Sequence, residues 1–248
     1  MNGFSLIPRS LLSALAVALL IAVPAHSQNA SVLAPAGTEY FVGFMQNDDE
    51  LSGANARFMG LLITSQVATV GSVEIPGRDA TPFSVRPGEF YSISIPRAFE
   101  HTISEDTIGN GTQSIIAAIR VTSRAPVSVF VVNARNQTTA GYPAVPVSHW
   151  GRHYLPLTLP NSLGTRTSEL MIISAYDDTY VRFTPRATTV RQDRGDVREI
   201  KLDRGRTYFV QALANMAGVN TADLSGSEIV ATNPIGVVSG HVRTTITR

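Results

Sequence analysis

The chain has 248 residues, with 20 basic and 19 acidic side chains and a formal net charge of +1. This near balance gives no electrostatic reason to expect a nucleic acid or a membrane surface as the partner. The chain has no cysteine, which excludes disulfides and a thiol nucleophile, so the apolar core alone must hold the fold.

The first 27 residues have the pattern of a secretory signal peptide. Arg9 supplies a positive charge, Leu11 to Val23 are apolar, and Ala25-His26-Ser27 is a small-x-small cleavage site. The apolar stretch is shorter than the roughly 20 residues that a membrane helix needs. We therefore expect residues 1–27 to be removed on export, although an uncleaved anchor helix is the alternative.

No later segment is apolar and long enough to span a membrane, so the remaining chain is expected to be secreted or attached to the cell surface. It would then have no transmembrane segment after removal of the signal peptide. A short leader followed by a chain without cysteine favours a bacterial exported protein, since secreted animal modules often carry disulfides.

Apolar and polar residues alternate through most of the remaining sequence. Such alternation places one face of a strand in a core and the other in water, as in antiparallel sheets. The clearest alternating runs are Ser92 to Ile95, Tyr180 to Thr184 and Glu199 to Asp203. Phe58 to Ile63 and Val127 to Val132 are almost wholly apolar and suit central strands.

Turn-forming residues separate these runs, at a spacing typical of β-sandwiches and barrels. The turns are expected at Pro76-Gly77, Pro87-Gly88, Gly109-Asn110-Gly111, Asp177-Asp178, Arg204-Gly205 and Asn233-Pro234. One short helix is possible within Val210 to Ala217, which could equally be a loop. The pattern predicts an all-β fold.

The remaining chain also repeats itself at an offset of about 110 positions, and such a repeat indicates two copies of one structural unit. Five segments recur in the same order. Gly37 and Tyr40 return as Gly151 and Tyr154, Leu62 to Ser65 as Ile172 to Ala175, Val73 and Ile75 as Val181 and Phe183, Gly88 and Tyr91 as Gly205 and Tyr208, and Pro126-Val127 as Pro234-Ile235.

We therefore expect two tandem antiparallel β-sandwich-like units, residues 28–140 and residues 141–248, that share one strand order. The segment Gly141 to Pro146 between them is extended by its prolines. Because this segment is too short to be a flexible linker, the two units are expected to pack together.

Few residue clusters suggest chemistry. His149 and His153 could share a metal only on a helix, and their segment is predicted as strand or loop, so inter-unit packing is favoured. Asp48-Asp49-Glu50 lacks the spacing of a calcium loop and is interpreted as a solvated loop. No serine elbow, phosphate loop or dinucleotide fingerprint is present. No catalytic, metal-binding or cofactor-binding residue is predicted.

Two aromatic residues at the junction are candidates for partner binding, because aromatic side chains dominate interface hot spots. They are Tyr142 and Trp150, and Trp150 is the single tryptophan of the chain. The alternative for a lone tryptophan in a β domain is a place in the core.

The second half contains a run of motifs that resembles the N-terminal domain family of the IgG Fc-binding protein. The most specific motif is Asp223-Leu224-Ser225-Gly226-Ser227-Glu228-Ile229 followed by Asn233-Pro234-Ile235-Gly236-Val237-Val238-Ser239-Gly240-His241. Glu169 to Ile173, Asp178 to Pro185 and Leu202 to Tyr208 precede it, and the first half fits through Thr38 to Phe44, Leu61 to Ser65 and Val121 to Val132.

The resemblance implies a β-rich extracellular domain and supplies no catalytic residues. Members of the family usually continue past the Gly-His step, so a minimal version or a chain truncated at its C-terminus is expected. The animal members are rich in cysteine, whereas this chain has none. Fc binding is therefore not carried over with the resemblance.

These observations favour an exported, non-enzymatic binding or adhesion module that contacts an extracellular protein or a glycan through loops on a β scaffold. An exported carbohydrate-active enzyme on a β-sandwich is the alternative from another class. A cleft with two carboxylates, one of raised pKa, would favour the enzyme. A structural unit of a longer surface protein is a third possibility.

Overall fold

The computed structural model describes residues 35–48, 58–102, 108–109, 113–114, 116–136, 138–160, 166–213 and 222–244. The predicted signal peptide, residues 1–27, lies outside these ranges, as do Asp49 and Glu50. Residues Ala34–Arg248 form one compact body. The description below concerns this body, and its two halves are called the first and the second unit.

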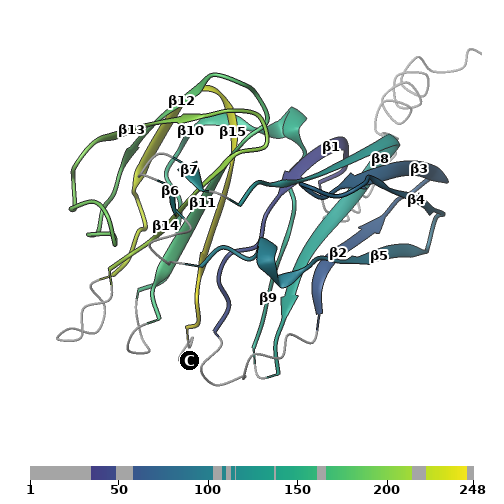
Figure 1. Ribbon diagram of the computed structural model, residues 1–248, viewed down its shortest axis with the longest axis horizontal. Coiled ribbons are helices and arrows are strands. Elements are labelled where there is room, and N and C mark those ends of the chain that lie inside the picture. The colour runs from purple at the N-terminus through teal and green to yellow at the C-terminus, as the bar shows by residue number, and fades with distance from the viewer. Residues whose placement is uncertain are drawn as a thin grey trace, which may run out of the picture. The chain divides into compact units, whose positions relative to one another are not determined.

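The first unit is a seven-stranded antiparallel sheet (Figure 1). Its strands follow the order β4-β3-β8-β2-β5, and β1 and β9 also pair with β8. Their bounds are β1 Gly37–Val42, β2 Phe58–Thr64, β3 Thr69–Glu74, β4 Thr81–Val85, β5 Phe90–Ser94, β8 Ile119–Ala134 and β9 Thr139–Pro143.

The second half is a six-stranded antiparallel sheet in the order β13-β12-β15-β11-β14, with β10 also paired to β15. Its strands are β10 Gly151–Tyr154, β11 Ser168–Ser174, β12 Thr179–Thr184, β13 Arg198–Leu202, β14 Thr207–Gln211 and β15 Glu228–His241. The short strands β6 Ile108–Gly109 and β7 Gln113–Ser114 pair with each other, and η1 Arg97–Phe99 and η3 Val147–His149 are single 3₁₀ turns.

The predicted all-β fold and the predicted repeat are both confirmed. Strands β1 to β5 and β8 of the first sheet correspond in order to β10 to β14 and β15 of the second. Only β9 lacks a counterpart among the described residues. The two sheets thus share one topology, although the intervening loops differ in length.

The register of the strands corrects two of the predicted equivalences. Val127 and Ile235 pair with Gly37 and Gly151, and two residues further on Val129 and Val237 pair with Ile63 and Ile172. Ile63 also pairs with Tyr91, and Ile172 with Tyr208, so the predicted match of Tyr91 with Tyr208 is confirmed. The same register makes Ile63, not Leu62, the counterpart of Ile172. Because successive side chains of a strand point to opposite faces, an error of one residue exchanges core and outer positions.

The second correction concerns the third strand of each unit. Val73 pairs with Val121, and Phe183 pairs with Ile229. Since Val121 and Ile229 are the partners of Tyr40 and Tyr154 in the two units, Val73 corresponds to Phe183. The predicted match of Val73 with Val181 was therefore wrong by two residues, which left the side chain on the correct face.

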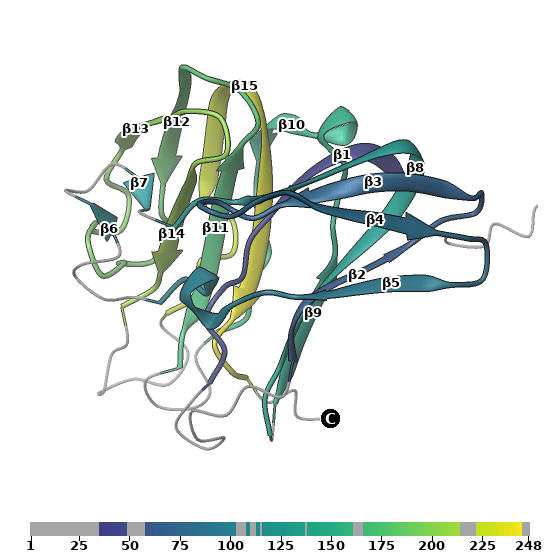
Figure 2. The same cartoon turned by 45° about the vertical axis from the view of Figure 1, so that its right-hand side comes forward.

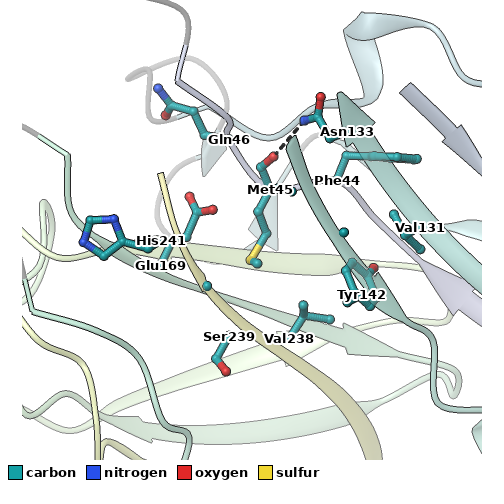
Figure 3. A pocket seen from close by; sticks show the side chains of 13 residues that line it. Phe44, Met45, Gln46, Val131, Asn133, Tyr142, Glu169, Val238, Ser239 and His241 are labelled. Carbon is teal, nitrogen blue, oxygen red and sulfur yellow. Dashed lines mark hydrogen bonds between the residues drawn. The ribbon is translucent and has the colours of Figure 1, made fainter. Parts of the chain in front are cut away.

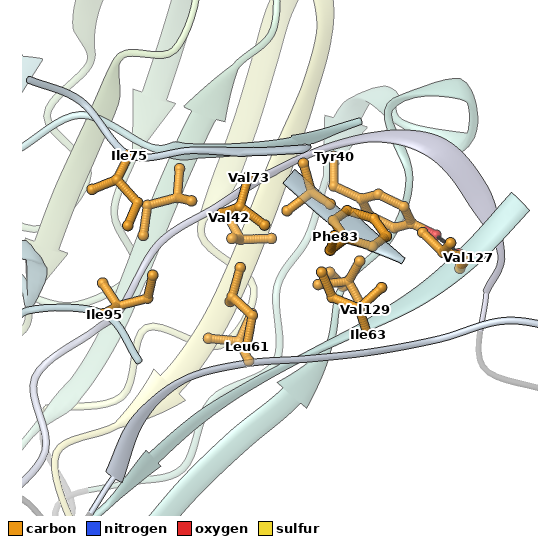
Figure 4. Close-up of a cluster of buried hydrophobic side chains, with 14 of the residues drawn as sticks. Tyr40, Val42, Leu61, Ile63, Val73, Ile75, Phe83, Ile95, Val127 and Val129 are labelled. Atoms are coloured by element: carbon orange, nitrogen blue, oxygen red, sulfur yellow. Dashed lines mark hydrogen bonds between the residues drawn. The ribbon is translucent and has the colours of Figure 1, made fainter. Parts of the chain in front are cut away.

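Each unit encloses its own core because one long strand bends through it. The first part of β8 pairs with β1 and β3, and the second part pairs with β2 and β9. Figures 1 and 2 show β3 and β4 on one side and β2 and β5 on the other. Figure 4 shows the apolar side chains enclosed there, which include Leu61, Ile63, Val73, Phe83 and Val129.

A proline marks the bend in each long strand. Pro126 lies within β8 and Pro234 within β15, so the turn predicted at Asn233-Pro234 was wrong. Proline has no N–H for the ladder, and it is tolerated where a strand passes from one layer to the other. A tyrosine hydroxyl donates to the carbonyl of the next residue at both bends, Tyr40 to Val127 and Tyr154 to Ile235.

The short helix considered within Val210 to Ala217 is not formed where the structure describes that segment. Val210 and Gln211 belong to β14, where they pair with Leu170 and Glu169. Backbone pairing with β11 therefore overrides local helix propensity, and residues 214–217 lie outside the described ranges. In the part of the chain that is described, no helix is long and apolar enough to cross a membrane.

Candidate functional site

The two β units contact each other through a third apolar cluster, as the short connection between them predicted. Phe41 from the end of β1 packs with Met171 and Ile173 of β11 and with Phe209 of β14. These side chains occupy the outer face of the second sheet, opposite to its own core. The contact therefore positions the edge of the first sheet beside β15.

Polar contacts border this cluster. The Arg204 guanidinium donates to Glu39 Oε1 at 2.7 Å and stacks over the Phe41 ring, 5.5 Å from its centroid. Gln211 Nε2 donates to Gln46 Oε1 at 2.9 Å. Such groups fix the relative position of the two units, and an open groove remains beside them.

We call this opening the junction groove. It has a volume of about 400 Å³, which falls within the range of ligand sites. One wall comes from the connection between the units and the other from β15. The lining residues are Phe41, Tyr142, Pro143, Ala144, Val145, His149, Trp150, Tyr154, Ile173, Gly236, Val237, Val238 and Ser239.

Both aromatic residues predicted for partner binding line the junction groove. Trp150 donates its indole N–H to the Val145 carbonyl at 2.9 Å and lies over Gly236. A Cβ atom at Gly236 would be 2.7 Å from the indole ring. This close approach explains why glycine follows Pro234-Ile235, and it holds the indole in one orientation along the wall of the groove.

Tyr142 lines the groove and is bound to the backbone of the segment after β1. Its hydroxyl donates to the Gly43 carbonyl at 2.8 Å and accepts from the Gly43 N–H at 3.3 Å. Burial raises the pKa of this hydroxyl well above its usual range. The side chain is thus a fixed, partly exposed apolar surface, and its hydroxyl is committed to the backbone.

A smaller cavity of about 110 Å³ shares the lining residues Tyr142, Val238 and Ser239 with the groove (Figure 3). We call it the polar pocket. Its lining includes Glu169 and His241 together with Gln46, Met45 and Asn133. Figure 3 shows the Asn133 amide beside Met45, and its nitrogen donates to the Met45 carbonyl at 3.4 Å.

Glu169 is the unusual acid of the polar pocket. Burial raises the pKa of its carboxyl well above its ordinary value, and the nearby Glu100 carboxylate raises it further. The Gln211 amide, which donates to Glu169 Oε2 at 3.1 Å, acts in the opposite direction. Burial also lowers the pKa of the neighbouring His241.

Glu100 does not line the polar pocket, because its carboxylate is bound on several sides. It accepts hydrogen bonds from the Asn47 N–H at 3.0 Å and from Asn133 Nδ2 at 2.8 Å. The buried Arg135 guanidinium forms an ion pair with it. Satisfied in this way, Glu100 is a structural anion that holds the loop after β1 against β8.

The described part of the polar pocket differs from the geometry of a glycoside hydrolase site. A pair of carboxylates across an open cleft is the geometry of glycoside hydrolysis. Among the described residues that line it, the polar pocket presents one carboxyl, that of Glu169, and its volume of about 110 Å³ is below the roughly 300 Å³ of small ligand sites. Among the described residues, no group of three or more His, Asp or Glu side chains could hold a metal ion.

The remaining polar clusters predicted from the sequence are separated in the structure. His149 lines the junction groove and lies 3.1 Å from the Ser148 hydroxyl. His153 is exposed on β10 and lies 3.3 Å from Glu228. The interpretation of Asp48 as part of a solvated loop was wrong, because Asp48 is 3% exposed. Its Oδ2 atom forms ion pairs with Arg166 Nε at 3.2 Å and with Arg243 Nη1 at 3.3 Å.

Sequence reasoning missed the polar pocket. In the sequence, Glu169 stands at the start of one family motif and His241 at the end of another. The available signal was a single acid at the start of the otherwise apolar run Leu170 to Ile173. An acid in a buried strand requires partners, and Gln211 and Gln46 come from elements distant in the sequence.

Comparisons with known proteins agree with the resemblance seen in the sequence. The family model of the IgGFc binding protein matches residues 140–248. The IgGFc-binding protein of Homo sapiens is 26% identical over 208 residues, which are 82% of this chain and 4% of that relative. No solved structure matches. Residues 140–248 are therefore similar to the IgGFc-binding protein family, and the chain spans only a small part of the length of this human relative.

Proposed function

We propose that this chain is an exported, non-enzymatic binding module that contacts an extracellular protein through the junction groove. The observation that carries the proposal is the rigid apolar wall formed by Trp150 and Tyr142. Both rings are fixed by hydrogen bonds to the backbone. Fixed aromatic side chains in a concave site lose little entropy when a partner binds.

Further features of the groove support a protein partner. Val145 is 45% exposed at the rim, and His149 adds a polar group beside it. An apolar centre with a polar rim is the usual anatomy of a protein interface. The human relative is named for binding IgG Fc, so immunoglobulin Fc is the first probe to test.

The predicted export and domain division belong to the same proposal. Residues 1–27 would be the signal peptide, and residues 28–140 and 141–248 would be the two units that build the groove. The structural role within a longer surface protein agrees with the short span, 4%, that this chain covers in its human relative. Binding through the groove is compatible with that role.

The test is a binding screen of the purified chain against IgG Fc, a panel of extracellular proteins and a glycan array. Val145→Asp should weaken binding to any protein captured by about tenfold or more, since a charge at an apolar contact is desolvated without a partner. Val70→Asp is the matched control, because Val70 is 42% exposed on β3 and does not line the groove.

Equal binding by the two variants would place the partner surface elsewhere and contradict the proposal. Capture of glycans alone would replace the protein partner with a carbohydrate. Turnover of a hydrolase substrate that is lost in Glu169→Gln would favour the enzyme. Glu169 is the natural residue for this variant because it has the raised carboxyl pKa that a general acid needs.

A further inference from the structure

The first unit contributes one extended segment to the contact between the two units. We call it the first strap, and it consists of Phe41, Gly43 and Met45, which alternate along the end of β1 and the residues after it. Phe41 is 6% exposed in the interface cluster. A Cβ atom at Gly43 would lie 2.7 Å from Met171 Sδ, and one at Gly240 would lie 2.7 Å from Met45 Cε.

The repeat places a second strap on the second unit. Tyr40 pairs with Val121 and Tyr154 pairs with Ile229, so the residues after the two tyrosines correspond. Phe41, Gly43 and Met45 therefore have as their counterparts Leu155, Leu157 and Leu159. These leucines are 63%, 80% and 41% exposed, respectively. We call them the leucine strap.

The leucine strap is held in position by its intervening residues. Pro156 is buried, and its carbonyl accepts from the Gly226 N–H at 2.9 Å. The Thr158 hydroxyl donates to Asp223 Oδ1 at 2.6 Å, and its N–H donates to the Ser225 hydroxyl at 2.9 Å. Since alternate residues of an extended segment face opposite ways, this anchoring turns the three leucines outward.

The receiving surface has a counterpart in the first unit, where Ser92 holds the position of Phe209. In the second unit, the first strap lies on the outer face of β11, β14 and β15 around Met171, Phe209 and Val238. Its counterpart is the outer face of β2, β5 and β8 in the first unit, where the side chains of Leu62 and Phe130 are partly exposed. Phe90 on the same face is 70% exposed.

In the described part of the chain, the leucine strap is thus exposed on the second unit, and the outer face of β2, β5 and β8 is partly exposed on the first. We propose that the leucine strap of one copy of this chain docks on the outer face of β2, β5 and β8 of a second copy. The contact would repeat between molecules the one that the two units make within a chain. Because it joins two different surfaces, it is heterologous and extends head to tail.

The polar border of the internal contact is not repeated. Glu39 and Arg204 form an ion pair at the internal contact. Their counterparts in the repeat are His153 and Pro87, and His153 lies beside Glu228. Association between copies therefore rests on apolar burial, and it should be weaker than the contact within the chain and tolerant of salt.

Sedimentation velocity over a concentration series, up to about 100 µM, tests the proposal. The purified chain should form species larger than a dimer as its concentration rises. Leu157→Asp and Phe90→Asp should each be monomeric. Val70→Asp should associate as the unmodified chain does, and thermal unfolding confirms that each variant is folded.

A mixture of the two monomeric variants gives the decisive result. Each variant retains the surface that the other has lost, so one heterologous contact can form and the mixture should yield dimers and nothing larger. A monomeric unmodified chain throughout the series would overturn the proposal. So would association that survives Leu157→Asp, or a mixture that stays monomeric.

Discussion

At the residue scale, we expect His101 to make the stability of the fold sensitive to pH. Its ring lies 5.3 Å from the Phe209 ring, and its Nε2 is 3.4 Å from the Thr207 hydroxyl. Burial lowers the pKa of His101 to about 4. The folded state therefore keeps the imidazole neutral at pH values where the unfolded chain binds a proton.

The sign follows from this difference in bound protons. Between its unfolded pKa of 6.5 and its folded value of about 4, the unfolded state holds more protons, so stability falls as the pH falls. At about 1.4 kcal/mol per unit, His101 should cost about 3 kcal/mol of unfolding free energy across that range. Urea unfolding at a series of pH values measures it.

Two variants separate His101 from the other titrating groups. His101→Gln should reduce the loss of stability between pH 6.5 and 4. His153→Gln, at an exposed position, is the control. The raised pKa of Glu169 acts in the opposite direction, since the folded state then binds the extra proton. A pH profile unchanged by His101→Gln would show that the imidazole is not kept neutral.

A second prediction at this scale concerns the tyrosines at the strand bends. Tyr40 is fully buried, and burial raises the pKa of its hydroxyl to about 12. Tyr40→Phe and Tyr154→Phe would each leave a carbonyl of the bend without its donor, which should cost about 1–3 kcal/mol in urea unfolding. Tyr180→Phe, at a position 43% exposed, should change stability little, and an equal loss there would refute the assigned role.

At the element scale, strand identity was predictable because burial of one face imposes a period of two. The runs at Tyr180 to Thr184 and Glu199 to Asp203 became β12 and β13 with little change of bounds. Gly88 and Gly205, expected in turns, have positive φ angles of 80° and 72°. These features depend on residues that are close together in the chain, so they can be predicted from the sequence.

Strand register and the bends were less predictable, because they depend on partners distant in the chain. From the sequence alone, Pro234 is expected in a turn. It lies within a strand because β15 pairs with β10, β11 and β12. Similarly, Leu62 and Ile63 are both apolar, and only their pairing shows that Ile63 faces the core. The groove residues Tyr142 and Trp150 were found because they lie at the junction, whereas Glu169 and Asp48 required knowledge of their partners.

At the scale of the whole molecule, the contact between the units should make unfolding cooperative. The Ala118 N–H donates to the Gly205 carbonyl at 2.8 Å, and the Thr207 hydroxyl donates to the Ile116 carbonyl at 2.7 Å. With the apolar cluster around Phe41, these bonds couple two cores that are separate in space. We expect one urea transition when unfolding is followed by tryptophan fluorescence and by circular dichroism.

Gly43→Leu should uncouple the units without damaging either core. A Cβ at this position already lies 2.7 Å from Met171 Sδ, so a larger side chain must push the strap away from β11. The two probes should then report separate midpoints, because Trp150 senses the junction and circular dichroism senses both sheets. The counterpart substitution Leu157→Gly, at a residue 80% exposed, should keep the midpoints together. Coincident midpoints in Gly43→Leu would mean that the two units fold as one body without help from this contact.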